Sequence, residues 1–290
     1  MKDLPDYGTP LVINVALTGM VPRQREYPAV PEQPDQIATD ALACIAAGAS
    51  NVHLHARDMD GEPAVSREIY AEIIRRIRRA APDVVICVST SGRVHRTFED
   101  RSDVLALDGE LKPDLASLTL GSLNFPRQAS VNEPQMIARL ADTMRERHIV
   151  PELEVFDLGM IDYAHYLIER GVLRPPFAFN LLLGSLGTIA ATAENLAMMV
   201  RRLPHGAYWQ AAGIGRAQWP MNALGVTMGG HVRTGLEDNL FMDAAKTDRA
   251  TNPRLVARVA ALAAALGRPL ATREETRQLI GLGARTPALR

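Results

Sequence analysis

Short apolar runs alternate with longer amphipathic segments along most of the chain. Eight runs rich in valine, isoleucine and leucine have the length of strands. They cover residues 11–19, 51–56, 84–92, 114–122, 151–157, 177–184, 207–213 and 231–238. The segments between them have a helical period; in residues 66–80, for example, Ile69, Ile73 and Ile77 form one stripe opposite arginines. This alternation predicts parallel strands joined by crossover helices.

Eight strand–helix units favour a closed barrel over an open sheet, which usually has fewer strands. No Ser/Gly-rich linker and no shift in composition divides the chain into two smaller domains. The sequence therefore predicts an α/β fold of the TIM (β/α)8 barrel type, as a single domain over residues 1–290.

Residues 271–283 predict an extra C-terminal helix. It has a capping box from Thr272 to Glu275 and Gly281 as its stop. A barrel does not need this helix, so the sequence leaves open whether it makes a subunit contact or is a simple surface appendage.

Composition narrows the class of ligand. The 32 basic and 33 acidic residues nearly cancel, so no global field marks a protein that binds nucleic acid or a membrane surface. No run reaches the roughly 18 apolar residues of a membrane span. Only two cysteines are present, which fits a reducing compartment. We expect a cytoplasmic protein with a small-molecule ligand.

Two histidines stand one residue apart in the second apolar run, Asn-Val-His-Leu-His-Ala. Alternate side chains of a strand point the same way, so His53 and His55 share a face and project into the barrel mouth. Such a pair offers two ligands to zinc or a similar divalent ion, which needs at least one more. The alternative is two buried histidines that are hydrogen-bonded to their neighbours.

The third ligand can be sought among acids at other strand ends. The eighth run ends in Glu237 and Asp238, and its strand closes next to the first. If the strand continues that far, Arg233, Gly235 and Glu237 lie on one face. An ordinary salt-bridged strand end is the alternative.

The fifth run carries Glu152 and Glu154 at alternate positions. Two carboxylates facing inward are costly to bury without a cation, so they indicate a metal, an arginine or a substrate partner. Glu152 is the stronger candidate for function; the alternative is a structural ion pair with Arg233 or Arg93.

A glycine-rich turn follows the seventh run, where TIM barrels often bind phosphate through backbone N–H groups. Gly213, Gly215 and the adjacent Arg216 are therefore candidates for binding the phosphate or pyrophosphate of a cofactor. A tight turn that serves only geometry is the alternative.

Seven motifs together resemble the β-keto acid cleavage enzymes, the family of 3-keto-5-aminohexanoate cleavage enzyme. The motifs are NVALTGMVPR, VHLHARDMDGEP, VSTSGR, SLTLGSLNF, PELEVFDLGM, FNLLLGSLGT and HVRTGLEDNL. The resemblance covers about residues 10–265. It implies a zinc-dependent TIM barrel, typically a homotetramer, in which a β-keto acid and acetyl-CoA give acetoacetate and a new acyl-CoA.

The resemblance also implies residue roles. It assigns His53, His55 and Glu237 as zinc ligands, and it matches Arg233 and Asp238 to the pair that abstracts a proton. Because a guanidinium is almost always protonated, the Asp238 carboxylate is the expected base.

The same resemblance places four residues at the keto acid end of the substrate. They are Ser89, Gly92, Ser122 and Asn124. Their hydroxyl and amide donors can hold the carboxylate and bear part of the developing charge.

One departure from the family pattern concerns the substrate. Members that act on an aminated substrate are expected to have an acid shortly after the first Thr-Gly, whereas residues 20–23 here are Met-Val-Pro-Arg. The distal group of the substrate is therefore expected to be neutral, apolar or anionic. Two other functions stay open, a zinc aldolase or lyase that works without acetyl-CoA and a barrel that only binds a metabolite.

Overall fold

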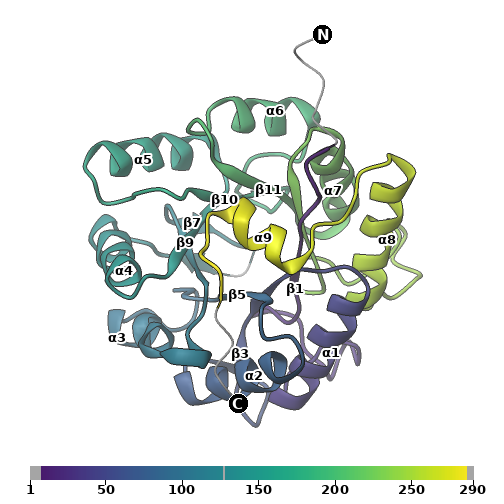
Figure 1. Cartoon of the computed structure of the whole chain (residues 1–290), viewed down its shortest axis with the longest axis horizontal. Coiled ribbons are helices and arrows are strands. Elements are labelled where there is room, and N and C mark those ends of the chain that lie inside the picture. The colour runs from purple at the N-terminus through teal and green to yellow at the C-terminus, as the bar shows by residue number, and fades with distance from the viewer. Residues whose placement is uncertain (1–7, 127, 286–290) are drawn as a thin grey trace.

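Eight parallel strands close into a barrel in the order β1, β12, β11, β10, β9, β6, β5 and β2 (Figure 1). The computed structural model describes residues 8–126 and 128–285. The barrel strands are β1 Ile13–Ala16, β2 Asn51–Leu54, β5 Val85–Val88, β6 Leu115–Thr119, β9 Val150–Val155, β10 Ala178–Leu183, β11 Tyr208–Gly213 and β12 His231–Thr234. Each of the eight apolar runs overlaps one of these strands, so the predicted TIM barrel is confirmed.

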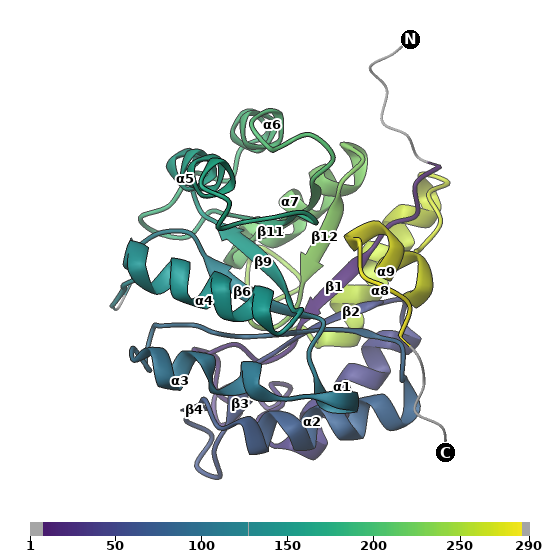
Figure 2. The same ribbon diagram turned by 60° about the vertical axis from the view of Figure 1, so that its left-hand side comes forward.

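Helices lie around the barrel and across one of its ends, and most of them connect consecutive strands (Figure 2). They are α1 Pro34–Ala46, α2 Arg67–Ala80, α3 Phe98–Ser102, α4 Pro134–Glu146, α5 Leu158–Glu169, α6 Ala193–Arg201, α7 Gln218–Thr227, α8 Asn252–Ala265 and α9 Arg273–Ile280. The stripe predicted on α2 packs inward, with Ile73 and Ile77 fully buried. Amphipathic burial against the sheet thus decides where this helix lies.

The loops between the barrel strands and the helices contain short hairpins and 3-10 turns. Two antiparallel hairpins, β3 Ala56–Arg57 with β4 Pro63–Ala64 and β7 Leu123–Asn124 with β8 Ala129–Ser130, follow strands β2 and β6. Three single turns of 3-10 helix are η1 Asp103–Ala106, η2 Gly109–Leu111 and η3 Gly215–Ala217. The hairpins extend the rim at which the strands end.

Alternation along each strand separates two environments. On β2, Val52 and Leu54 join the apolar core between sheet and helices, whereas Asn51 and His53 point into the barrel. The barrel interior is therefore polar at mid-height, where many TIM barrels hold branched apolar residues.

The extra C-terminal helix α9 crosses the end of the barrel at which the strands begin (Figure 1). Its Ile280 packs with Val85, Leu115 and Tyr208 in one apolar cluster. The predicted capping box and the left-handed Gly281 stop are both present. The helix therefore closes the base of its own barrel, which is a role that the sequence left undecided and which differs from a simple appendage.

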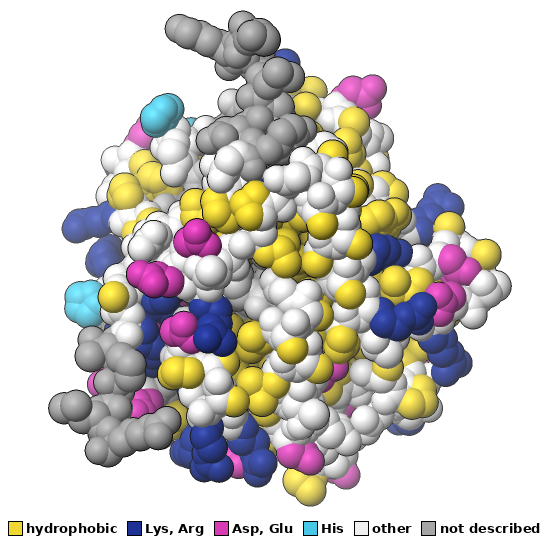
Figure 3. Space-filling view, turned by 45° about the vertical axis from the view of Figure 1, so that its right-hand side comes forward, with side chains coloured by type: hydrophobic (Ala, Val, Ile, Leu, Met, Phe, Trp, Pro, Cys, Tyr) yellow, Lys and Arg dark blue, Asp and Glu magenta, His cyan; other side chains and the backbone are white. Residues whose placement is uncertain are grey.

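The visible surface carries charges of both signs, and the cysteines lie inside the molecule. On the face seen in Figure 3, acidic and basic side chains are interspersed, with no broad field of one sign. Both cysteines are buried and free. Within residues 8–126 and 128–285, none of the helices has the length and apolar character of a membrane span.

Candidate active site at the barrel mouth

The two histidines meet inside the barrel mouth. His53 is the third residue of β2, and His55 follows the end of that strand. Both are buried, and their Nε2 atoms lie 3.2 Å apart. The prediction that alternate positions bring the imidazoles together is confirmed.

Glu237 reaches the histidines by a turn and not by a continued strand. Strand β12 ends at Thr234, so the condition under which Arg233, Gly235 and Glu237 would share one strand face is not met. Gly235 has φ 142°, and a side chain there would overlap the carbonyl group of Ala16. The turn instead lets the Glu237 N–H donate to the Ala16 carbonyl at 3.2 Å.

The Glu237 carboxylate completes a three-residue cluster. Its Oε1 lies 3.3 Å from Nε2 of His55, and its Oε2 lies 3.8 Å from Nε2 of His53. Together the three residues form a group that could hold a metal ion. A second such group, His53 with Cys87 and Glu152, lies deeper on the inner faces of β2, β5 and β9.

Unpaired atoms test whether the first cluster fits a divalent ion. Glu237 Oε2 is buried without a hydrogen-bond partner among the described residues, and the two Nε2 atoms face each other. Two nitrogen ligands of a tetrahedral zinc ion, each at about 2.0–2.1 Å, lie roughly 3.3 Å apart, close to the separation found here. The donor set and its spacing therefore fit zinc.

Protonation states favour the same conclusion. Burial, with help from Arg233, lowers the pKa of His53 well below its usual range. Burial opposes ionisation of Glu237, but Arg233 and both imidazoles outweigh it and hold the pKa of this carboxyl well below its usual range. Neutral imidazole and ionised carboxylate are the forms that bind metals.

Arg233 and Asp238 form a fully buried pair beside this cluster. Nε of Arg233 donates to Oδ2 of Asp238 at 2.9 Å, and NH2 donates to Oδ1 at 3.1 Å. The same NH2 group lies 2.8 Å from Oε1 of Glu237. Burial raises the pKa of Asp238 although Arg233 opposes the shift, which makes this carboxylate a stronger base than a free aspartate.

The two glutamates of β9 both face the interior but occupy different levels. Glu152 lies 3.7 Å from Nδ1 of His53, on the side away from the Nε2 atom that faces His55. Glu154 lies 3.7 Å from NH1 of Arg233 and accepts a hydrogen bond from Thr119. Neither forms an ion pair with Arg93.

Three amide side chains that sequence reasoning missed surround Glu152. Nδ2 of Asn14 and Nε2 of Gln210 donate to its Oε1 at 3.1 and 2.9 Å, and Asn180 donates to its Oε2 at 3.4 Å. Burial raises the pKa of Glu152 to about 7. The signal was present in the sequence, because each amide interrupts an apolar strand. The sequence alone does not show that these amides meet Glu152, because that contact depends on the register of strands far apart in the chain.

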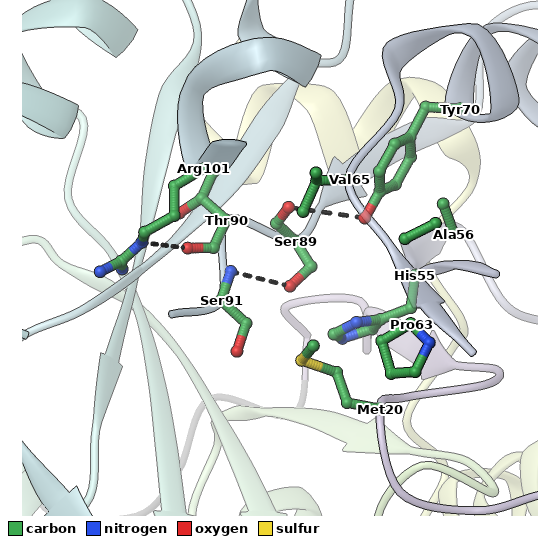
Figure 4. A pocket seen from close by; sticks show the side chains of 11 residues that line it. Met20, His55, Ala56, Pro63, Val65, Tyr70, Ser89, Thr90, Ser91 and Arg101 are labelled. Atoms are coloured by element: carbon green, nitrogen blue, oxygen red, sulfur yellow. Dashed lines mark hydrogen bonds between the residues drawn. The ribbon is translucent and has the colours of Figure 1, made fainter. Parts of the chain in front are cut away.

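Ser89 lines a pocket at the mouth together with His55 and Met20 (Figure 4). Gly92, in the same turn, is packed so closely that a side chain would meet Arg101. In the neighbouring loop, Oγ of Ser122 accepts a hydrogen bond from the backbone of Asn132, whereas Asn124 is exposed. The structure thus places the four predicted substrate residues on two loops of the rim.

The glycine-rich turn after β11 is already engaged in local packing. A side chain at Gly213 would overlap the backbone of Ala217, and the N–H of Gly215 donates to the carbonyl of Asp238 at 2.7 Å. Arg216 is exposed. These contacts give the two glycines a structural use, and the predicted binding of a cofactor phosphate stays a prediction.

We expect Gly19→Ala to lose metal affinity, because Gly19 has φ 64° and a side chain there would overlap Cγ of Glu237. Gly109→Ala is a matched control, since its φ is 58° and no atom lies within 4 Å of the added carbon. Both variants should lose about 1 kcal/mol of stability from the backbone conformation. Zinc titration should then show weaker binding for Gly19→Ala alone, and equal affinity in both would contradict the steric argument.

Known proteins are similar to this chain over most of its length. A model of the beta-keto acid cleavage enzyme family matches residues 10–282. The 3-keto-5-aminohexanoate cleavage enzyme of Fusobacterium nucleatum is 40% identical over 273 residues, which cover 94% of this chain and 98% of that protein. The 3-oxoadipate:acetyl-CoA acetyltransferase of Cupriavidus necator is 39% identical over 276 residues, or 94% of this chain and 95% of that protein.

A solved structure extends the agreement in fold. The apo structure of ObcA matches with a TM-score of 0.79 at 21% identity, and the match covers 88% of this chain and 66% of that chain. At this identity the likeness concerns the barrel alone.

Proposed function

Because the chain belongs to the beta-keto acid cleavage enzyme family, we propose that it is a zinc-dependent enzyme that converts a β-keto acid and acetyl-CoA into acetoacetate and a new acyl-CoA. The observation that carries this proposal is the cluster of His53, His55 and Glu237 next to the buried pair of Arg233 and Asp238.

The reaction exchanges two acyl groups. C2 of the β-keto acid loses a proton and forms a carbon–carbon bond to the acetyl carbonyl, and the CoA thiolate leaves. The thiolate then attacks the original keto carbonyl, the bond between C2 and C3 breaks, and the electron pair and a proton return to C2. Acetoacetate keeps the C1 carboxylate of the starting acid.

His53, His55 and Glu237 would hold the ion, with an open position for the substrate. A bound zinc ion supplies Lewis acidity at the β-carbonyl, which makes the adjacent C–H more acidic. Glu152 would orient His53 through the Nδ1 side of the ring, as carboxylates commonly do for histidine ligands.

Asp238 would take the proton from C2. Its raised pKa suits a base, and Arg233 fixes its orientation through two hydrogen bonds. Arg233 itself stays protonated, because three carboxylates surround it.

The distal group of the substrate would meet an apolar wall. Met20 lines the pocket beside His55. Arg23 is occupied by Glu62 at 2.7 Å and by Glu32 at 3.3 Å, so the nearby Glu32 carboxylate already has a cation. Residues 20–23 themselves offer an ammonium group no carboxylate.

We therefore expect a higher kcat/KM for 3-oxoadipate or an unsubstituted 3-oxo acid than for 3-keto-5-aminohexanoate. The difference should be roughly ten- to hundredfold, the usual cost of an unpaired charged group. Steady-state kinetics with purified acids measure it. The aminated acid being the best substrate of the panel would contradict this prediction.

One experiment tests the proposed function as a whole. Metal content of the purified protein is measured, and acetoacetate is quantified over a panel of β-keto acids with and without acetyl-CoA. We expect about one zinc per chain and acetoacetate only when acetyl-CoA is present. Cleavage without acetyl-CoA would indicate an aldolase or lyase, and no turnover of any acid would indicate a barrel that only binds a metabolite.

The homotetramer implied by the family resemblance and the cytoplasmic location expected from composition remain proposals. Light scattering of the purified chain would measure the oligomeric state directly. Fractionation of cells that express the chain would test the location.

A further inference from the structure

Arg101 is a buried guanidinium without a carboxylate partner. Its side chain belongs to α3 and is 2% exposed, yet no acid in the described part of the chain forms an ion pair with it. Nε donates to the carbonyl of Thr90 at 2.8 Å, and NH2 donates to Oδ1 of Asn132 at 2.8 Å. A buried cation normally needs a compensating charge, and Glu154 acts on this one from beyond ion-pair distance, so a nearer anion would stabilise it.

The contacts of Arg101 join two loops of the rim, one with Ser89 and Gly92 and the other with Ser122 and Asn124. We call these the two substrate loops. Thr90 lies in the turn that contains Ser89 and Gly92 (Figure 4). Asn132 reaches the other loop, because its N–H donates to Oγ of Ser122 and its Nδ2 donates to the carbonyl of Gly121. Arg101 therefore fixes the spacing of the loops and adds positive charge behind them.

Arg93 is a second cation in the same corner. Its Cζ lies 3.5 Å from the ring centroid of Phe125, which follows Asn124 in the second loop. Among residues 8–126 and 128–285, its guanidinium makes no hydrogen bond or ion pair. Stacking uses the face of the guanidinium and leaves the N–H groups at its edge free for a planar acceptor.

Acidic side chains at the barrel mouth oppose the binding of a negatively charged substrate. Glu154, Glu237 and Asp238 all face the site, and Arg233 is shared among them. Glu237 and Glu154 also act on Arg93, although burial is the larger influence and lowers its pKa. A negatively charged substrate would be repelled by these acids unless another part of the rim attracted it.

We propose that Arg93, with Arg101 behind it, binds the C1 carboxylate of the β-keto acid. The inference rests on the proposed function and deepens it, since it supplies the charge that Ser89, Gly92, Ser122 and Asn124 cannot. Arg93 contacts the substrate carboxylate through bidentate, charge-assisted hydrogen bonds, and Arg101 is a positioning residue.

Kinetics of Arg93→Gln and Arg93→Lys test the contact. Arg93→Gln should raise KM for the β-keto acid roughly ten- to hundredfold while KM for acetyl-CoA stays unchanged. The lysine variant should fall between glutamine and wild type, because it keeps the charge and loses the planar fork. Arg96→Gln, an exposed arginine of the same loop, should match wild type.

Two outcomes of the kinetics overturn the assignment. A rise in KM for acetyl-CoA alone would indicate that Arg93 binds the phosphates of CoA and not the C1 carboxylate. A rise in KM confined to dicarboxylic substrates would indicate that Arg93 binds the distal carboxylate of the substrate.

Calorimetric titration with acetoacetate separates this inference from the proposed function. Acetoacetate carries the same C1 carboxylate and needs no turnover to bind. If wild type binds acetoacetate and Arg93→Gln binds it at least about tenfold more weakly, the inference stands even when no acyl transfer is detected. If acyl transfer is normal but wild type and Arg93→Gln bind acetoacetate equally, the inference fails and the proposed function stands.

Discussion

Glu237→Gln should purify without stoichiometric zinc and should form acetoacetate more than about 100-fold more slowly than wild type. That loss exceeds the roughly 10- to 100-fold typical of residues that only support a metal ligand. Glutamine keeps the volume of the side chain, so the turn after β12 should be preserved.

The physical reason is the charge of the donor set. Glu237 is the one acidic residue in the three-residue cluster, and its pKa is held well below the usual range, so it supplies the negative charge of the donor set. An amide oxygen is a poor zinc ligand, and the amide N–H₂ would face the imidazole nitrogens as a donor. Two histidines alone leave the ion with too few protein ligands.

Glu154→Gln is the matched control for the metal measurement. It makes the same chemical change in the same mouth, at a side chain outside the cluster. It should retain about one zinc per chain. Full zinc occupancy in Glu237→Gln would show that the ion binds elsewhere, for which His53 with Cys87 and Glu152 is the alternative group.

The fold was predictable because its signals are local. Apolar runs, helical stripes and the capping box of α9 each depend on residues a few positions apart, and all appear in the structure. The contact between His53 and His55 was predictable for the same reason, since both belong to one strand and its end.

The rest of the site depends on contacts between distant segments. Asn14 and Glu152 are separated by 138 positions, and no spacing rule within either strand indicates that they meet. Glu237 was predicted to be a metal ligand through the family resemblance, but its route through the turn at Gly235 depends on the packing of that turn against Ala16. Arg101 and Asn132 carry no local pattern at all, although they connect the two substrate loops.

Asp238→Asn should keep its zinc and still lose roughly 10²–10⁴ in kcat, the range typical of a general base. The asparagine oxygen can still accept a hydrogen bond from Arg233, and Glu237 holds the same guanidinium at 2.8 Å, so the pair should stay in place. What the amide cannot do is accept the proton from C2. Exchange of C2 hydrogen for deuterium, followed without acetyl-CoA, isolates that step and should slow by a similar factor.

Asp60→Asn, an exposed aspartate of a rim loop, should match wild type in zinc content, in kcat and in exchange. The comparison separates the loss of a base from a general effect of removing a negative charge near the mouth. If Asp238→Asn exchanged C2 hydrogen at the wild-type rate, proton removal would belong to another group. Glu154 would then be the next candidate, because it lies beside Arg233, is outside the proposed metal cluster, and has a pKa that burial also raises.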